Sequence, residues 1–440
     1  MNPSSVAHDT SVTREATAPS VNATFRKVTL RVLPLLFLCY LVAYLDRVNV
    51  SFAKLSMLTD LNFSSAVYGL GAGMFFIGYF LFEIPSNMIL HKVGARRWIA
   101  RIMITWGLLS ALMAWVETPT AFYVLRFLLG MAEAGFYPGV LLYLTLWFPA
   151  ARRGRITALF MAGNPVSGIV GGPLSGFIMH AFAGFLGFTG WQWLFLVEAL
   201  PALILGVVVL FYLDDSVDKA KWLSAEEKTV LSQAIESDAS AKTHLSASSV
   251  FRSGRVWLLC LVYFGISIGS NTFGFWQPTI IKDAGVANPL FIGLLTTLPY
   301  IAALVCMLLA GRSADRMRER RWHVVLPILL AAIGFLICAL CKDQIVASMF
   351  GLVLVAIGII CAIPMFWALP TSFLGGAGAA AGIALINCTG NLGGFVSPVI
   401  MGWLTATTQS LTSGLYLVTG WLILTGALVI IFVPAKVVNR

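Results

Sequence analysis

Four ionisable residues inside apolar runs determine what chemistry this sequence can perform. Asp46 and Arg47 stand side by side near the end of the run at 30–50, and Arg126 and Glu133 lie in the run at 121–147. Seven residues make two helical turns, so Arg126 and Glu133 share one helix face about 10 Å apart along the axis. Ionisable groups within such runs usually face a bundle interior or a watery cavity and mark ion or substrate pathways.

These residues combine two acids with two guanidinium groups, and their charges cancel while both acids are ionised. Protonating the acids would leave two positive charges that attract an anion, and a bound anion would in turn favour the protonated acids. The alternative is that the four groups only join two helices. Because buried ion pairs contribute little net stability, that purely structural use explains them less well. Adjacent residues point about 100° apart on a helix, so Asp46 and Arg47 cannot both face one point.

The composition identifies an integral membrane protein. Hydrophobic residues make up 59% of the chain and charged residues 11%, against about 25% charged residues in soluble domains. Runs of roughly 20 apolar residues cross a bilayer as helices and are too long for barrel strands. Twelve such runs are found, at 30–50, 67–90, 98–116, 121–147, 156–180, 192–213, 256–281, 290–311, 323–341, 345–367, 377–404 and 412–434.

The basic residues predict how the chain is oriented in the membrane. An even number of spans places both termini on one side, and that side then receives 23 of the 29 Lys and Arg residues. By the positive-inside rule both termini are cytoplasmic. The formal charge of +10 therefore reflects the membrane topology, and we expect contact with the lipid bilayer and no binding to nucleic acid.

The runs divide into two sets of six, which predicts five parts of the chain. These are a disordered cytoplasmic tail at 1–24, an N-terminal half at 25–213, a cytoplasmic linker at 214–253, a C-terminal half at 254–434 and a second tail at 435–440. Within the linker, SAEEKTVLSQAIES fits either a short amphipathic helix or a solvated segment. Basic segments with the same spacing follow the second and eighth runs, so the halves repeat and a binding site is expected between them.

The motifs resemble those of the major facilitator superfamily and, within it, the anion:cation symporter family. The resemblance rests on YLDRVN at 44–49, FEIPSN at 82–87, VGARRW at 93–98, RFLLGMAEAGFYPG at 126–139 and GWQWLFLVE at 190–198. It implies an all-α membrane protein with twelve transmembrane helices in two six-helix halves. The family includes bacterial permeases for galactonate, tartrate, phthalate and hydroxyphenylacetate.

This resemblance implies proton-coupled symport of a small organic anion into the cell by alternating access. The anion would be a sugar acid, a hydroxy acid or an aromatic carboxylate, and the alternative is an organic-anion exporter or antiporter on the same scaffold. Arg47 then looks like the residue that binds the substrate carboxylate, Asp46 and Glu133 like proton carriers, and Arg126 like their coupling partner. We expect a monomer in the plasma membrane, the inner membrane if the source is bacterial.

Further polar and aromatic residues are candidates for substrate binding. Tyr44 lies one turn before Arg47 and can offer a hydroxyl group, although packing would explain it equally well. The second half has no deep charge, so polar side chains must complete the site there, unless they only hydrogen-bond neighbouring helices. The remaining candidates are Tyr79, Asn271, Gln277, Trp367, Asn387 and Asn391.

Other functions find less support in the sequence. Isolated histidines and cysteines without CxxC pairs argue against a metal site, and we expect no cofactor. No cluster of nucleophile and base indicates an enzyme. Glu83 and Glu198 stand near the ends of runs, where we expect interhelical hydrogen bonding or gating.

The cytoplasmic loops suggest a gate made of charge pairs. Asp315 and Arg316 follow the eighth run, and Arg96 and Arg97 follow the second. The superfamily motif usually has Gly and Asp where Asn87 and His91 stand here, so charge pairing on the cytoplasmic side should depend mainly on Asp315.

We therefore predict that Asp315→Asn shifts the protein toward the cytoplasm-open state, because it removes one partner of the pairs that close that side. Cysteine labelling from both sides of the membrane measures the shift. Unaltered labelling would mean that the loop serves only as a topology signal.

Overall fold

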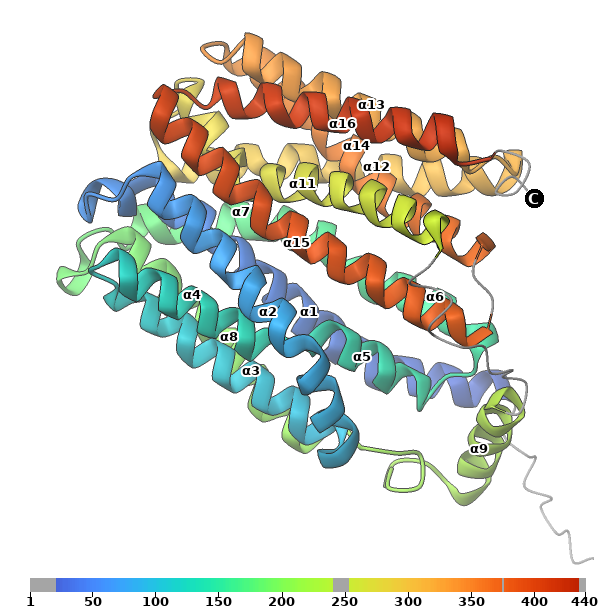
Figure 1. Cartoon of the computed structure of the whole chain (residues 1–440). Helices are drawn as coiled ribbons and strands as arrows, with labels where there is room; N and C mark the ends of the chain where they lie inside the picture. The colour runs from blue at the N-terminus through green and yellow to red at the C-terminus, as the bar shows by residue number, and fades with distance from the viewer. Residues whose placement is uncertain (1–20, 240–252, 374–375, 435–440) are drawn as a thin grey trace, which may run out of the picture.

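The computed structural model describes residues 21–239, 253–373 and 376–434, and the described residues form long helices joined by short turns (Figure 1). Most of both expected tails, and part of the expected linker, lie outside these residues. Eleven helical segments in the described part are long and apolar enough to span a membrane. The predicted all-α membrane architecture is therefore confirmed.

The first half of the chain supplies helices α1 to α8. The run expected at 156–180 is helical as α6 and α7, but Gly, Ser, Asn and Pro make it less apolar than the other spans. The bounds are α1 Val21–Asp60, α2 Ser65–Val93, α3 Ala95–Leu112, η1 Met113–Trp115, α4 Pro119–Glu133, α5 Phe136–Thr145, α6 Ala150–Met161, α7 Gly163–Ala181, η2 Phe185–Gly187 and α8 Gly190–Tyr212.

The second half begins after α9, Ala225–Ala239, a helix in the expected linker region. Lys27 of α1 binds Glu227 of α9 at 2.8 Å, and this hydrogen bond lowers the pKa of the Glu227 carboxyl. The other helices are α11 Gly254–Asp283, α12 Pro289–Met317, α13 Arg321–Leu340, α14 Ile345–Phe373, α15 Gly376–Thr408 and α16 Thr412–Phe432.

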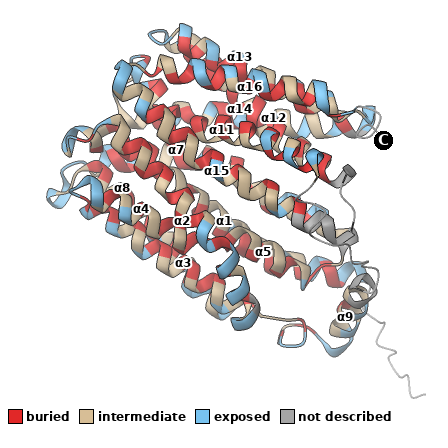
Figure 2. Cartoon of the chain, viewed as in Figure 1, coloured by how far each residue is buried: buried red, intermediate tan, exposed pale blue. Residues whose placement is uncertain are grey.

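Burial follows the needs of a membrane bundle. Figure 2 shows buried residues along the faces where helices meet and exposed residues on the outside. Many exposed side chains are large and apolar, including Phe211 at 84% exposure. An apolar outer surface is stable only against lipid, so the exposure pattern supports the membrane interpretation.

The two halves contact each other along α2 with α15, α7 with α12 and α1 with α11. Figure 1 places the start of α1, helix α9 and the end of α16 at one end of the molecule. The close contacts lie toward the other end. There Gly69 packs on the backbone of Gly402, and Gly172 packs on Gly293. Glycine allows this approach because no Cβ separates the helices.

The fourth expected span is broken rather than continuous. Helix α4 ends at Glu133, Gly135 has a φ of +85°, and α5 starts at Phe136. A left-handed backbone favours glycine because it lacks a Cβ. The break therefore ends α4 inside the bundle and sets Glu133 at a helix terminus. Discontinuous membrane helices often form the binding sites of transporters.

The glycine contact between α7 and α12 generates a prediction. A Cβ on Gly293 would lie 3.1 Å from the Gly176 Cα and closer still to the Gly172 carbonyl, so Gly293→Leu should force the halves apart at this end. Spin labels at Glu117 and Gln344, both exposed at this end, should then show a longer mean distance.

The matched control is Gly420→Leu, because a Cβ on Gly420 meets nothing within 4 Å. The control should leave the label distance unchanged. Equal distances in wild type and Gly293→Leu would contradict a close packing role for this contact.

Candidate functional site

A central cavity of about 190 Å³ lies between the two halves and is lined by residues from both. Seven of the eight residues predicted to bind substrate line it. From the first half come Arg47, Tyr44 and Tyr79, and from the second half come Asn271, Trp367, Asn387 and Asn391.

Gln277 is the exception, because it does not line this cavity. Its side chain is 3% exposed, and its amide nitrogen donates to the Thr296 carbonyl oxygen at 3.2 Å. The helix face explains the difference, since Gln277 is six residues beyond Asn271 and its direction around the helix axis differs by about 120°, a third of a turn.

An ion pair between Arg47 and Glu133 forms the charged part of the site. A terminal nitrogen of Arg47 donates to Glu133 Oε1. Arg47 is 27% exposed while Glu133 is 3% exposed, so the guanidinium faces the cavity and the carboxylate lies behind it. The rings of Phe75 and Tyr79 lie 5.2 and 5.4 Å from the guanidinium carbon and help to fix its position.

Arg126 lies deeper and does not line the cavity. It is 0% exposed, and all three of its guanidinium nitrogens lack a hydrogen-bond partner in the described part of the chain. Its guanidinium carbon is 5.0 Å from the centroid of the Phe75 ring. The same ring therefore contacts both Arg47 and Arg126. Burying a charge without hydrogen bonds is costly, which makes a structural role a poor explanation of Arg126.

Asp46 faces helix α3 rather than the cavity. It is 1% exposed and accepts hydrogen bonds from the Trp106 indole, from Ser110 Oγ at 2.8 Å and from Asn49 Nδ2 at 3.1 Å. Asp46 and Arg47 thus point to different neighbours, as their adjacency on one helix requires. The expected use of Asp46 as a proton carrier would have to operate from this enclosed position.

Glu83 links the two halves at the cavity. The side-chain nitrogens of Asn387 and Asn391 donate to Glu83 Oε1 and Oε2, each at 3.2 Å. Asn387 and Asn391 lie one turn apart on α15, which lets both reach one carboxylate on α2. The expected interhelical hydrogen bonding of Glu83 is confirmed. Glu198 likewise accepts a hydrogen bond from Ser175 Oγ at 2.6 Å.

Several lining residues were not predicted from the sequence. They include Tyr40, Tyr137, Asn164 and Tyr263. Tyr40 had a signal, because it lies one turn before Tyr44 on the face that carries Arg47. The others come from helices whose orientation the sequence does not reveal. With Tyr44 and Tyr79, five tyrosines surround the cavity.

The expected gating residues lie apart from the cavity, on or beside the connections between helices. The Arg96 backbone nitrogen donates to Asp215 Oδ1 at 2.9 Å, and its side chain approaches the same carboxylate at 3.9 Å. Arg97 and Arg316 are exposed, and the Asp315 side chain lies outside what the structure describes. Within the described residues, no group of three His, Cys, Asp or Glu side chains could hold a metal ion.

Comparison with known proteins identifies the family. The Major Facilitator Superfamily model matches residues 36–398 and 259–440. The chain is 53% identical over 408 residues to an Agrobacterium vitis protein named "Putative tartrate transporter", covering 92% of this chain and 94% of that protein. It is 50% identical over 422 residues to the Pseudomonas putida protein named "Putative metabolite transport protein NicT", covering 95% and 96%.

A solved structure shows the same fold. A D-xylose-proton symporter is similar with a TM-score of 0.73 at 17% identity, covering 94% of this chain and 99% of that one. The relatives agree with the resemblance found in the motifs, and they are transporters rather than enzymes. The chain belongs to the Major Facilitator Superfamily and is a multi-pass membrane transporter.

Proposed function

We propose that this protein is a proton-coupled symporter that carries a small organic anion into the cell by alternating access. The observation that carries the proposal is the Arg47 and Glu133 ion pair on the wall of a cavity between the two halves. The name of the Agrobacterium vitis relative supports an organic acid as substrate.

Coupling follows from competition for one guanidinium group. Arg47 binds a substrate carboxylate best with two parallel hydrogen bonds, but an ionised Glu133 occupies one of its terminal nitrogens. A proton on Glu133 removes that competing charge and frees Arg47 for the substrate. Substrate and proton therefore each favour the binding of the other.

The remaining cavity wall suits a compact acid that carries hydroxyl groups. The tyrosine hydroxyls and the Asn271 amide offer donors and acceptors. The volume of about 190 Å³ is below the range of roughly 300–1,000 Å³ for drug-sized ligands. A hydroxy acid or a compact sugar acid therefore fits better than a bulky aromatic carboxylate.

Two further residues have roles in this proposal. Arg126 shares the Phe75 ring with Arg47, so it raises the positive potential that retains the anion and stabilises ionised Glu133 after proton release. Asp46 is a second proton site, because it is a buried carboxylate one residue from Arg47. The cytoplasmic loops with Asp315, Arg316, Arg96 and Arg97 stabilise the alternate, outward-open state.

The geometry of the guanidinium group gives a prediction about substrate binding. Arg47→Lys keeps the charge but loses the planar fork, so substrate affinity should fall by roughly 10- to 100-fold, the value of one charge-assisted hydrogen bond. Equilibrium binding of tartrate to purified protein measures the loss. Wild-type affinity in this variant would remove Arg47 from the binding site. Lys92→Arg, at an exposed position, is the matched control.

The proton site gives a prediction about transport. Glu133→Gln mimics the protonated acid, so anion binding should survive. Uptake driven by a pH gradient should fall to background, because the carrier can no longer release its proton and return empty. Exchange of labelled for unlabelled substrate needs no empty return and should persist.

Both assays in proteoliposomes decide the role of Glu133. Retained gradient-driven accumulation would make Glu133 a bystander, and loss of exchange together with binding would make it structural. In either case Asp46 becomes the better proton site. Glu117→Gln, on an exposed loop, controls for loss of a carboxylate elsewhere.

Counterflow that drives substrate outward against protons would instead favour an exporter or antiporter.

A further inference from the structure

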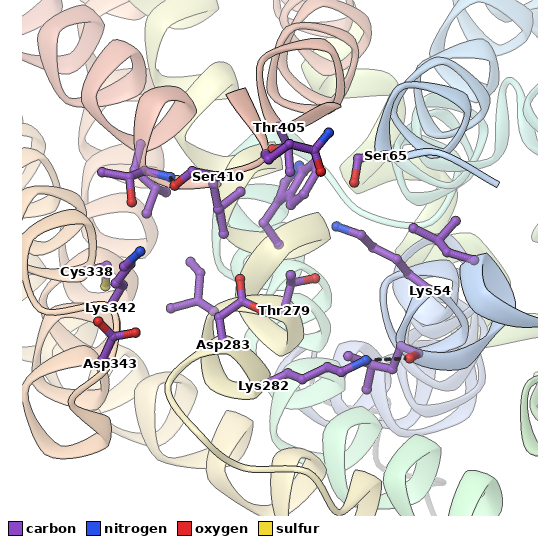
Figure 3. Close-up of a pocket in the computed structure, with 18 of the residues that line it drawn as sticks. Lys54, Ser65, Thr279, Lys282, Asp283, Cys338, Lys342, Asp343, Thr405 and Ser410 are labelled. Carbon is purple, nitrogen blue, oxygen red and sulfur yellow. Dashed lines mark hydrogen bonds between the residues drawn. The ribbon is translucent and has the colours of Figure 1, made fainter. Parts of the chain in front are cut away.

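A second cavity lies between the halves at the end of the molecule opposite the start of α1 and the end of α16. Its volume is about 510 Å³, and residues from α1, α11, α15 and the turn after α13 line it (Figure 3). It is separate from the central cavity: Trp276 lines this outer cavity, and its neighbour Phe275 lines the central one. Trp276 and Tyr68 are both fully buried, and their ring centroids lie 5.7 Å apart in an edge-to-face contact.

Lys54 is the unusual residue of this outer cavity. It is 6% exposed, and its Nζ lies 3.2 Å from the Trp276 ring centroid and 4.6 Å from that of Tyr68. Figure 3 shows its ammonium group pointing into the pocket. Across the described residues this ammonium has no hydrogen-bond partner, although it carries three donors.

Two more buried donors without partners line the same cavity. They are the Trp276 indole nitrogen and the Thr279 hydroxyl, neither of which has a hydrogen bond within the described part of the chain. Buried polar groups are normally paired, but these three donors around one cavity have no hydrogen-bond acceptor. An anion bound in the cavity would supply one.

The other charges of the outer cavity also favour an anion. Three lysines line it against two aspartates: Lys54, Lys282 and Lys342 against Asp283 and Asp343. Lys282 already has a hydrogen-bond partner, since its Nζ donates to the Leu55 carbonyl oxygen at 2.8 Å. Lys54 is therefore the buried cation that remains available to a ligand.

Helix α1 connects this cavity with the central site. Lys54 lies seven residues beyond Arg47, so the two cations share one face of the helix about 10 Å apart along its axis. We propose that the outer cavity is an anion site where Lys54 holds a carboxylate of the substrate before it reaches Arg47. This inference rests on the proposed function for the identity of the anion.

The test measures binding of sodium tartrate to the full-length protein by calorimetry in wild type, Arg47→Gln, Lys54→Gln and the double variant, with Lys54→Arg and Lys92→Gln as controls. Arg47→Gln should leave one weaker binding component. The affinity of that component should fall at least about tenfold, or about 1.4 kcal/mol in binding free energy, when Lys54→Gln is added. Lys54→Arg should retain it, and Lys92→Gln should change nothing.

The possible failures are distinct. If the remaining component is the same with and without Lys54→Gln, Lys54 serves only to join the halves through Trp276, and the outer site is wrong. If sodium chloride gives the same Lys54-dependent signal as sodium tartrate at equal concentration, the assignment to carboxylates is wrong. If Arg47→Gln changes nothing while Lys54→Gln abolishes binding, the outer site stands and the proposed central site fails.

Discussion

The cost of keeping charge out of water is the constraint on which this structure depends. Arg47 of α1 pairs with Glu133 of α4 in the first half, whereas buried Arg126 and Lys54 have no hydrogen-bond partner within the described residues. The carboxylate of this pair is buried and the guanidinium is partly exposed. The two groups can therefore separate, and Arg47 can turn to the cavity, without unfolding a helix. A fully buried pair would be inert, and a fully exposed pair would be screened and weak.

The backbone conformation positions the two residues of that ion pair. Glu133 reaches Arg47 because α4 ends there, and α4 ends there because Gly135 accepts a left-handed conformation. Gly130 and Gly78 bring α4 and α2 into backbone contact, which places Phe75 against both arginines. The glycines between the halves work in the same way, since close contact at one end lets the cavity form between the bundles.

Much of this arrangement could be predicted from the sequence. The apolar runs predict the membrane-spanning helices, because few other backbone structures can cross a bilayer. The ionisable residues within these runs indicate Arg47 and Glu133 as site residues. The sequence could not show that Asp46 faces Trp106, because the partner of a buried carboxylate depends on helix rotation. Helix rotation also determines that Gln277 lies outside the cavity and that Tyr137 and Tyr263 line it, which the sequence does not reveal. The break after Glu133 had a signal in Gly135 and Pro138, but an apolar run conceals it.

In the transport cycle proposed above, the positions of the two cations let an anion cross without meeting a deep electrostatic trap. Lys54 and Arg47 are both on α1, about two turns apart, and they line separate cavities. Each cation also has a competing partner: the aromatic rings for Lys54 and Glu133 for Arg47. An anion that displaces such a partner gains less binding free energy than it would from an unpaired cation. It therefore dissociates more readily. Transport requires both binding and release, so compensated cations serve a carrier better than free ones.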